Sequence, residues 1–328
     1  MEQATEAVVQ PTKAVKKEKT LNIGYWKKYG VFYLMMAPAL IVLIINNYIP
    51  MVGSIIAFKK ITYESRSFLE NFINGKWVGF DNFDYLFKTS DAWRITRNTV
   101  LYNAVFIALN VIVGVAIALM FNQMRNRRLA KFHQSVMFLP FFLSWIIIAY
   151  LVYAFLNPQL GMMNKEILPL FGAGEVEWYS DPKWWPVILP IVNVWKNIGY
   201  YVVFYLAAII GIDKEYYEAA TIDGASKWRQ IRSITLPLIR PVMIVLTLLQ
   251  IGKIFYADFG LFYQVTRNAG MLYDTTLVID TYVYQGFLVT GNLGLSSAAG
   301  FYQAIVGFVI IIIANLIVRR VSKDDALF

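Results

Sequence analysis

The sequence predicts an all-α, polytopic membrane protein with six transmembrane helices. Hydrophobic residues make up 58% of its 328 residues, and charged residues make up only 16%. Apolar runs recur that match the roughly 20 helical residues needed to cross a bilayer core. These runs lack strand-like alternation, so helices rather than a closed barrel must satisfy the backbone hydrogen bonds in lipid.

The predicted spans follow one another along most of the chain. A polar, lysine-rich tail over residues 1–30 comes first, and a composition of this kind is typical of a partly disordered segment. Residues 31–328 then form one transmembrane domain. Its spans are predicted at 31–58, 100–121, 135–156, 186–210, 238–256 and 297–318. The first run is too long and too far from the N-terminus for a signal peptide, so it is a retained span.

Charges in the loops predict the orientation. The loop 122–134 carries Arg125, Arg127, Arg128 and Lys131 without any acid, whereas the loops after the third and fifth spans are mostly acidic. Cytoplasmic loops carry the excess of lysine and arginine, so both termini are predicted to be cytoplasmic.

Two features of the outer side need an interpretation. The loop 59–98 fits poorly because it holds seven basic and five acidic residues, and snorkelling of Arg94 and Arg97 at the foot of the second span is one explanation. Trp178, Trp184 and Trp185 precede the fourth span and are interpreted as anchors at the membrane interface.

Several chemistries are excluded by residue content. The chain has no cysteine and one histidine, His133, and it has no phosphate-binding glycine loop. We therefore expect no catalytic residue, no metal site and no cofactor in this chain. The net charge of +9 comes largely from the predicted inner loops and the C-terminal tail. It favours a membrane surface over nucleic acid, because no basic face is interleaved with stacking aromatic residues.

A charged insert separates the fourth and fifth spans. In residues 213–236, Asp213 can cap a first short helix, Gly224 marks a turn and Ser226 can cap a second short helix. Leu236-Pro237 is predicted to end the second helix before the fifth span. The insert is thus predicted to be a cytoplasmic pair of helices to which a partner protein can bind.

This insert resembles the EAA loop of ABC importer permeases. The matching positions are Glu218, Ala219, Ala220, Asp223, Gly224, Ala225, Ile234, Leu236 and Pro237. Ile231 departs from the pattern, which commonly has phenylalanine there. Further segments, such as "VGFDNFDYLF" and "VWKNIGYYVVFYLAAI", resemble the sugar-type, MalF-like permeases, closest to the LplB-like branch, whose members handle complex oligosaccharides.

The resemblance implies a type I ABC importer permease fold in a bacterial inner membrane, with the coupling loop at 212–237. The implied partners are a second similar permease, an ATPase homodimer and an extracytoplasmic solute-binding protein. ATP and magnesium would be bound by the ATPase, and alternating access would move cargo. Glu218 would contact the ATPase, and Gly224 would permit the bend. A secondary transporter is the less favoured alternative, because the spans have almost none of the acids that commonly relay ions.

The spans on either side of the insert are predicted to line the substrate path. Asn193, Asn197 and Tyr200 share a helical face in the fourth span, as do Gln250, Lys253 and Ala257 in the fifth. Amides and rings suit sugars, although the amides could equally join helices to one another. Lys196 is also predicted for this path, at a depth similar to that of Lys253 and toward the outer half of the membrane.

Lys253 raises the question of the cargo's charge. It stands where the related permeases typically have a small residue. It could pair with Asp258 or snorkel to the interface. The alternative is that it meets a carboxylate of an acidic, uronate-containing oligosaccharide such as an alginate or pectin fragment. A neutral oligosaccharide remains the competing substrate.

Overall fold

The computed structural model describes residues 23–62 and 67–321. Most of the predicted basic tail, 1–30, and the end of the chain beyond 321 lie outside the described residues. The described chain is helical apart from one pair of two-residue strands, which confirms the all-α class. It divides into an N-terminal unit that ends at Gly53 and a second unit that begins at Ser54.

The N-terminal unit is a continuous series of helical turns. It comprises α1 (Ile23–Leu43), the π-turn η1 (Ile44–Tyr48) and α2 (Ile49–Gly53). The π-turn lies just before Pro50, whose ring removes a backbone N–H, and such a turn allows the helix to continue past the proline. Leu34 and Val31 are among many exposed apolar side chains, as a lipid-facing helix requires.

The second unit begins with short elements and then one long helix. These are η2 (Ser54–Phe58), β1 (Lys59–Lys60), α3 (Phe68–Asn74), β2 (Lys76–Trp77), α4 (Asp81–Lys88) and α5 (Ser90–Gln123). The strands pair antiparallel, with Lys59 opposite Trp77.

The middle of the second unit holds a bent pair of helices, the α9 helix and the charged insert. The elements are α6 (Arg127–Phe138), η3 (Leu139–Phe142), α7 (Trp145–Leu156), η4 (Met163–Ile167), α8 (Leu168–Leu170), η5 (Pro182–Trp184), α9 (Trp185–Ile210), α10 (Lys214–Ile222), α11 (Lys227–Gln230) and η6 (Ile231–Thr235). The remainder is α12 (Leu236–Ile251), η7 (Gly260–Val265), η8 (Gly270–Leu272), α13 (Tyr273–Thr276), α14 (Ile279–Leu288) and α15 (Leu293–Val321).

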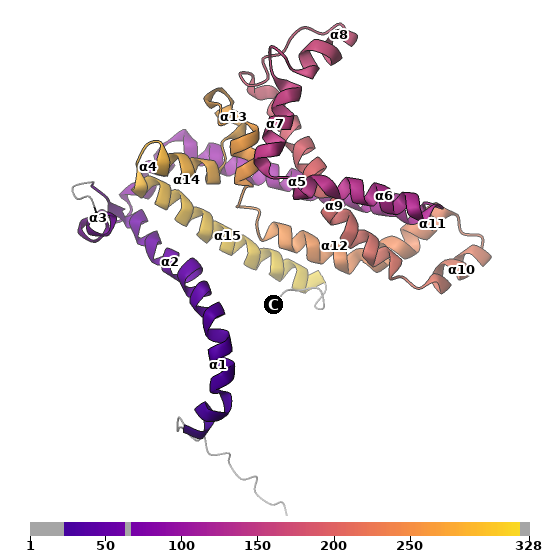
Figure 1. Ribbon diagram of the computed structural model, residues 1–328, viewed down its shortest axis with the longest axis horizontal. Coiled ribbons are helices and arrows are strands. Elements are labelled where there is room, and N and C mark those ends of the chain that lie inside the picture. Colours follow the sequence, from indigo (N-terminus) through magenta and orange to yellow (C-terminus); the bar gives the residue numbers. More distant parts are fainter. Residues whose placement is uncertain (1–22, 63–66, 322–328) are drawn as a thin grey trace, which may run out of the picture. The chain divides into compact units, whose positions relative to one another are not determined.

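Within the second unit, α5 packs along α9, and α12 contacts both of these helices as well as α15 (Figure 1). One apolar cluster joins α5, α9 and α12 around Val115, Val202 and Ile239. The helices α10 and α11 lie at one end of the unit, and α4 and α14 lie at the other (Figure 1).

The described chain has five helices long and apolar enough to cross a membrane, at Tyr29–Phe58, Ser90–Gln123, Pro182–Ile210, Lys227–Ile251 and Leu293–Arg320. A sixth span requires the bent pair Arg127–Phe142 and Trp145–Leu156, whose axes differ by 102°. The predicted third span is therefore not one regular helix. Pro140 has no N–H for an ongoing helix, and the Ser144 side chain accepts a hydrogen bond from the Ile147 N–H and so starts a new one.

The tryptophans before α9 are mostly buried, so the prediction of interface anchors is wrong for two of them. Trp178 and Trp185 are 5% and 0% exposed. The indole N–H of Trp178 donates to Asn164 Oδ1 at 2.8 Å, and that of Trp185 donates to the Trp178 carbonyl at 2.7 Å. Burial follows because these hydrogen bonds satisfy both indoles inside the protein. Trp184 stays partly exposed, beneath the Lys183 ammonium.

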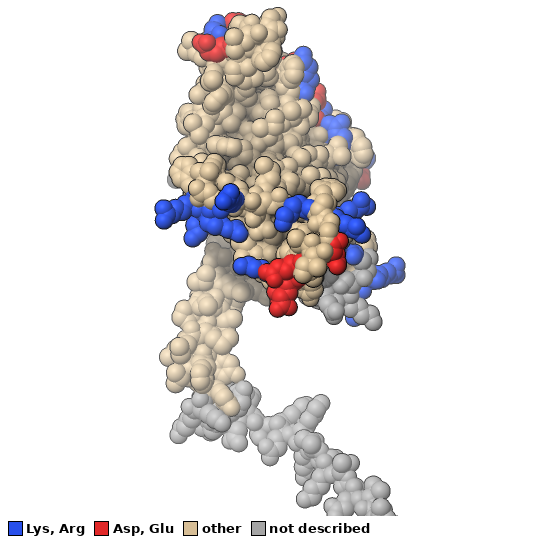
Figure 2. All heavy atoms as spheres, turned by 90° about the vertical axis from the view of Figure 1, so that its right-hand side faces the viewer, with Lys and Arg blue, Asp and Glu red and all other residues tan. Residues whose placement is uncertain are grey.

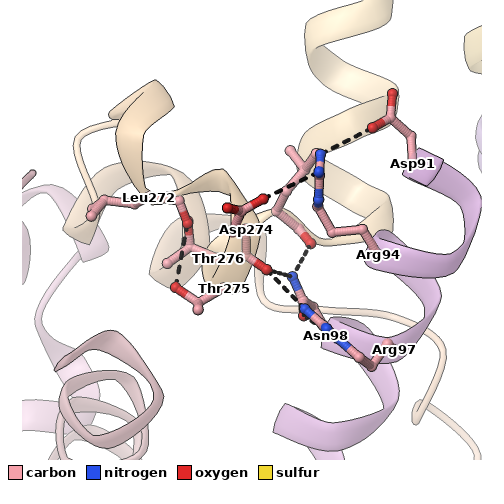
Figure 3. Close-up of polar contacts among 9 residues, drawn as sticks. Asp91, Arg94, Arg97, Asn98, Leu272, Asp274, Thr275 and Thr276 are labelled. Atoms are coloured by element: carbon pink, nitrogen blue, oxygen red, sulfur yellow. Dashed lines mark hydrogen bonds and ion pairs between the residues drawn. The ribbon is translucent and has the colours of Figure 1, made fainter. Parts of the chain in front are cut away.

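Arg94 and Arg97 do not snorkel to the interface, which corrects the earlier interpretation. Their side chains form ion pairs and hydrogen bonds with other residues of the protein (Figure 3). Arg94 pairs with Asp91 and with Asp274 of α13, at 3.1 Å in each case. Arg97 Nη2 donates to the Asp274 carbonyl at 2.9 Å, and Asn98 Nδ2 donates to the same oxygen at 3.2 Å. The two guanidinium groups therefore fasten the first turns of α5 to α13.

The basic loop 122–134 and the charged insert lie at the same end of the second unit. Asn122 and Gln123 at the end of α5 line a polar cavity together with Tyr217 of α10 and Gln230 of α11. Figure 2 faces this end and shows lysine and arginine side chains gathered there beside a smaller acidic group. The two segments thus lie at a common end, and that this end faces the cytoplasm stays a prediction from their charge.

The predicted orientation can be tested with single cysteines, because the chain has none. Arg127 and Gly174 are both exposed, and a Cβ at Gly174 would meet no atom within 4 Å. Arg127→Cys should resist an impermeant thiol reagent in intact cells, whereas Gly174→Cys should react. Permeabilised cells should label both variants. Labelling of Arg127→Cys alone in intact cells would contradict the topology.

Candidate functional site: a polar cavity and the charged insert

A polar cavity of about 590 Å³ lies between α5, α9, α12 and the turn that follows α12. Ligand pockets commonly have volumes of about 300–1,000 Å³. The lining residues are Asn103, Phe106, Ile107, Asn110, Asn193, Asn197, Tyr200, Tyr201, Leu246, Leu249, Gln250, Lys253, Tyr256, Ala257 and Asp258. We refer to it as the central cavity.

Six of the seven residues predicted for the substrate path line the central cavity. They are Asn193, Asn197, Tyr200, Gln250, Lys253 and Ala257. The three residues from α9 share one helical face, as expected. Those from the fifth span do not, because α12 ends at Ile251. The chain then makes turns in which the Lys253 N–H donates to the Gln250 carbonyl, so Lys253 and Ala257 reach the cavity from a turn rather than a helix.

Lys196 does not line the central cavity, which corrects its predicted place in the substrate path. The residue is 8% exposed. Its ammonium donates to the carbonyls of Leu143, Phe141 and Pro140 at 2.6, 3.1 and 3.4 Å. These carbonyls lie at the break between η3 and α7, where the helix does not continue, and only that of Pro140 also accepts a backbone N–H, from Leu143. The ammonium also lies 5.0 Å from the Trp145 ring.

Asn103, Asn110 and Asp258 also line the cavity and were not predicted. Asn110 Nδ2 donates to Gln250 Oε1 at 3.0 Å, so this pair does join two helices. The signal that could have found the asparagines is their spacing of seven within the second span, which places them on one face. The buried Oδ1 atoms of Asn110 and Asn193 accept no hydrogen bond within the described chain.

The two charged residues of the central cavity differ in their partners. Asp258 accepts hydrogen bonds from the Trp145 indole at 2.9 Å and from the N–H groups of Gly260 and Leu261 at 3.0 and 3.4 Å. Lys253 is exposed, and the described residues place no carboxylate within 4.0 Å of its ammonium. The predicted alternative, an ion pair between Lys253 and Asp258, is absent from this part of the chain.

The charged insert forms the two predicted helices and the predicted bend. The Asp213 side chain accepts from the Glu215 N–H, and the Ser226 side chain accepts from the Arg229 N–H. Gly224 has a φ of +76°. The Ala225 N–H donates to the Ala220 carbonyl at 2.8 Å, which closes a Schellman turn. A residue with a side chain rarely adopts this backbone conformation.

The prediction that Leu236-Pro237 ends the second helix is wrong. Residues Lys227–Ile251 form one continuous helical run into the fifth span. The turn before the proline is the π-turn η6, Ile231–Thr235. The missing N–H and the bulk of the Pro237 ring are accommodated by this wider turn. The insert is therefore joined to α12 without a flexible link.

The residues that match the EAA pattern differ in exposure. Glu218, Ala219, Asp223, Gly224 and Pro237 are exposed, whereas Ala220, Ala225, Ile234 and Leu236 are half-buried. Ile222, which was not predicted as part of this surface, is 87% exposed beside the bend. Trp228 on α11 is also exposed. Large apolar side chains exposed together are typical of a surface that binds another protein.

Residues 110–323 match the family described as binding-protein-dependent transport system inner membrane component. The chain belongs to this family. This permease is 32% identical to Protein LplB of Bacillus subtilis (strain 168), over 89% of each chain. It is 30% identical to the polygalacturonan/rhamnogalacturonan transport system permease protein YteP of the same organism, over 98% of this chain and 96% of YteP.

Two solved structures resemble the permease with a TM-score of 0.81 and 32% identity. One is a bacterial ABC transporter involved in the import of the acidic polysaccharide alginate, and the match covers 91% of this chain and 98% of that chain. The other is a bacterial alginate ABC transporter in complex with an alginate pentasaccharide-bound periplasmic protein, with 92% and 98% covered. The permease therefore has the type I importer fold of sugar ABC transporters, as the charged insert predicted. The described residues hold no group of three metal-ligating side chains.

Proposed function

We propose that this permease is the translocating subunit of an ATP-driven importer for acidic, uronate-containing oligosaccharides. The observation that carries the proposal is the Lys253 ammonium on the wall of the central cavity, with no carboxylate of the described chain beside it. On a cavity wall with low-dielectric protein on one side, a cation of this kind attracts a carboxylate more strongly than it would in bulk water.

The rest of the cavity suits a sugar. Asn193, Asn197 and Gln250 offer amide groups for hydroxyls, and Tyr200 and Tyr256 offer rings that can cover the apolar faces of a pyranose. Asp258 is the one acid of the lining, but three donors of the chain already bind its carboxylate. Its charge therefore opposes an acidic cargo less than a free carboxylate would.

The similar proteins support an acidic cargo. One solved relative is described as an importer of the acidic polysaccharide alginate, and YteP is described as a transporter of polygalacturonan and rhamnogalacturonan. A relative described as the lactose transport permease LacF of Rhizobium radiobacter, 27% identical, favours the competing neutral sugar. The charge in the cavity decides our choice between the two.

We further propose that the cargo arrives on an extracytoplasmic solute-binding protein and that ATP hydrolysis is coupled through the charged insert. An ATPase homodimer, which would bind the ATP and magnesium, would receive Ile222 and Trp228 as apolar anchors and Glu218 as a charged contact. A second similar permease would complete the path. Because η6 continues into α12, displacement of the insert would move the wall that carries Gln250.

The cargo proposal is tested by Lys253→Gln in the assembled importer reconstituted with its binding protein. Transport of hexagalacturonate should fall about 10-fold, since a hydrogen bond to a charged group contributes roughly 1.5–3 kcal/mol. Transport of its carboxyl-reduced counterpart should change little. Lys253→Arg keeps the charge and is the matched control. Equal losses for both probes, or a wild-type preference for the carboxyl-reduced probe, would rule out the acidic cargo and favour the neutral alternative.

A further inference from the structure

A second polar cavity lies between α7 and the segment that follows Asp258. It has a volume of about 300 Å³. Ile146, Ala149 and Tyr150 of α7 form one wall, and residues of η7 and the turn after it form the other. None of its residues belongs to the central cavity, and neither the sequence pattern nor the similar proteins assign it a role. We call it the outer cavity.

The outer cavity and the central cavity are linked through the first residue of α7. Trp145 at the start of α7 donates to Asp258, which lines the central cavity. Tyr150 is five residues further along α7, roughly 7 Å along the helix axis. The helix leads on to the loop 157–181, which the charge pattern predicts to be extracytoplasmic. The outer cavity is therefore formed in part by the helix that leads to the predicted outer side.

Arg267 is the only cation on the wall of the outer cavity. Its guanidinium carbon lies 4.0 Å from the centre of the Tyr153 ring, so the group is held by stacking. Within the described residues, no carboxylate lies within 4.0 Å of it. A stacked guanidinium without an acidic partner keeps its planar set of donors for a carboxylate from outside the chain.

The backbone that presents Arg267 is held in an unusual conformation. Arg267 and Asn268 have φ values of 54° and 50°, in the left-handed region that residues other than glycine seldom adopt. Gln285 Nε2 and the Tyr273 hydroxyl donate to Asn268 Oδ1 at 2.6 and 3.1 Å and fix the turn from outside. Backbone strain of this kind is concentrated at functional sites.

The remaining lining suits a pyranose ring. Tyr150 is 70% exposed, and Tyr263 faces the same cavity from η7. Gln264 supplies an amide beside them, and its side chain makes no hydrogen bond with another described residue. Rings for the apolar faces, an amide for hydroxyls and a guanidinium for a carboxylate together match one uronate residue.

We infer that the outer cavity is an entry subsite that binds one uronate residue of the incoming chain, with Arg267 on its carboxylate. This inference rests on the proposed acidic cargo and extends it to a second place in the protein. The subsite would act on oligosaccharides that are long enough to reach both cavities. Its contribution should therefore appear with a hexasaccharide and be weaker with a disaccharide.

The test uses the assembled importer in proteoliposomes, supplied with binding protein loaded with hexagalacturonate or with its carboxyl-reduced counterpart. Arg267→Gln should raise the concentration of hexagalacturonate-loaded binding protein needed for half-maximal transport about 10-fold. The maximal rate and the response to the carboxyl-reduced probe should not change. Lys183→Gln is the matched control, because Lys183 is an exposed lysine of the same predicted outer side that already pairs with Asp181.

A second variant distinguishes the loss of the guanidinium from a folding defect. Arg267→Asn also removes the guanidinium, but asparagine tolerates the left-handed backbone better than glutamine does. Loss of assembly in both variants, or equal effects on the two probes, would show that Arg267 serves packing and would overturn the subsite. If wild type prefers hexagalacturonate and both variants match wild type, the subsite fails while the proposed function stands. A wild-type preference for the carboxyl-reduced probe would instead refute the proposed function.

Discussion

Replacing Gly224 by valine is expected to reduce transport by about 10-fold or more while the permease still inserts and assembles. Gly224 has a φ of +76°, and a residue with a side chain pays roughly 1–2 kcal/mol to enter this region, with a further cost for a branched Cβ. The Schellman turn would open and change the angle between α10 and α11. The proposed anchors Ile222 and Trp228 would then no longer fit the ATPase together. Retention of the ATPase on the purified complex and cargo-stimulated hydrolysis are the measurements.

The control for this prediction is Gly224→Asn. A Cβ at Gly224 would meet no atom within 4 Å, so the defect must come from the backbone conformation and not from a clash. Asparagine is tolerated in the left-handed region and should retain most of the activity. Glu218→Lys, which reverses an exposed charge on α10, should also weaken ATPase retention. If both Gly224→Val and Glu218→Lys retained the ATPase and showed wild-type cargo-stimulated hydrolysis, the charged insert would not couple the ATPase to transport.

Replacing Lys196 by methionine is expected to destabilise the fold by several kcal/mol rather than to alter cargo selection. The substitution would leave the carbonyls of Leu143 and Phe141 without this donor, whereas the Pro140 carbonyl would keep its hydrogen bond from the Leu143 N–H, and each unpaired buried group costs roughly 1–3 kcal/mol. The break is tightly packed here, because a Cβ at Gly199 would lie 2.6 Å from the Met137 carbonyl oxygen. Yield and thermal unfolding of the solubilised permease would show the loss.

Lys183→Met is the matched control for Lys196→Met. The Lys183 side chain is 67% exposed and is paired with Asp181, so its loss should change the free energy of unfolding by less than about 1 kcal/mol. If Lys196→Met unfolded like wild type but altered the preference between acidic and neutral cargo, Lys196 would belong to the substrate path after all.

The sequence predicted the charged insert in detail because its signals are local. Asp213, Gly224 and Ser226 act on backbone groups within three to five residues, and the observed caps and Schellman turn are the ones that such residues form in any helix pair. The error at Pro237 arose for a related reason. A proline usually ends a helix, and whether a π-turn accommodates it instead depends on packing that the local sequence does not specify.

The cavity was predicted less completely, because its walls come from segments far apart in the chain. Helical spacing placed Asn193, Asn197 and Tyr200 on one face, and the structure agrees. The same spacing failed for Lys253, since α12 ends at Ile251. Asn103 stabilises that end, because its amide donates to the carbonyls of Ile254 and Tyr256 at 2.9 and 3.2 Å. This contact spans about 150 residues and leaves no local signal.

The sequence by itself determined the helical membrane class, the location of the insert and the family resemblance, because hydrophobic length, caps and turns depend on neighbouring residues. Only the tertiary structure decided which polar groups are left for a ligand. Lys196 and Lys253 are both predicted at similar depth in the outer halves of their spans, yet the first is bound to three carbonyls and the second lines a cavity without an acidic partner in the described chain. The difference lies in what distant helices bring beside each ammonium, and a buried charge is stable only where such partners or water reach it.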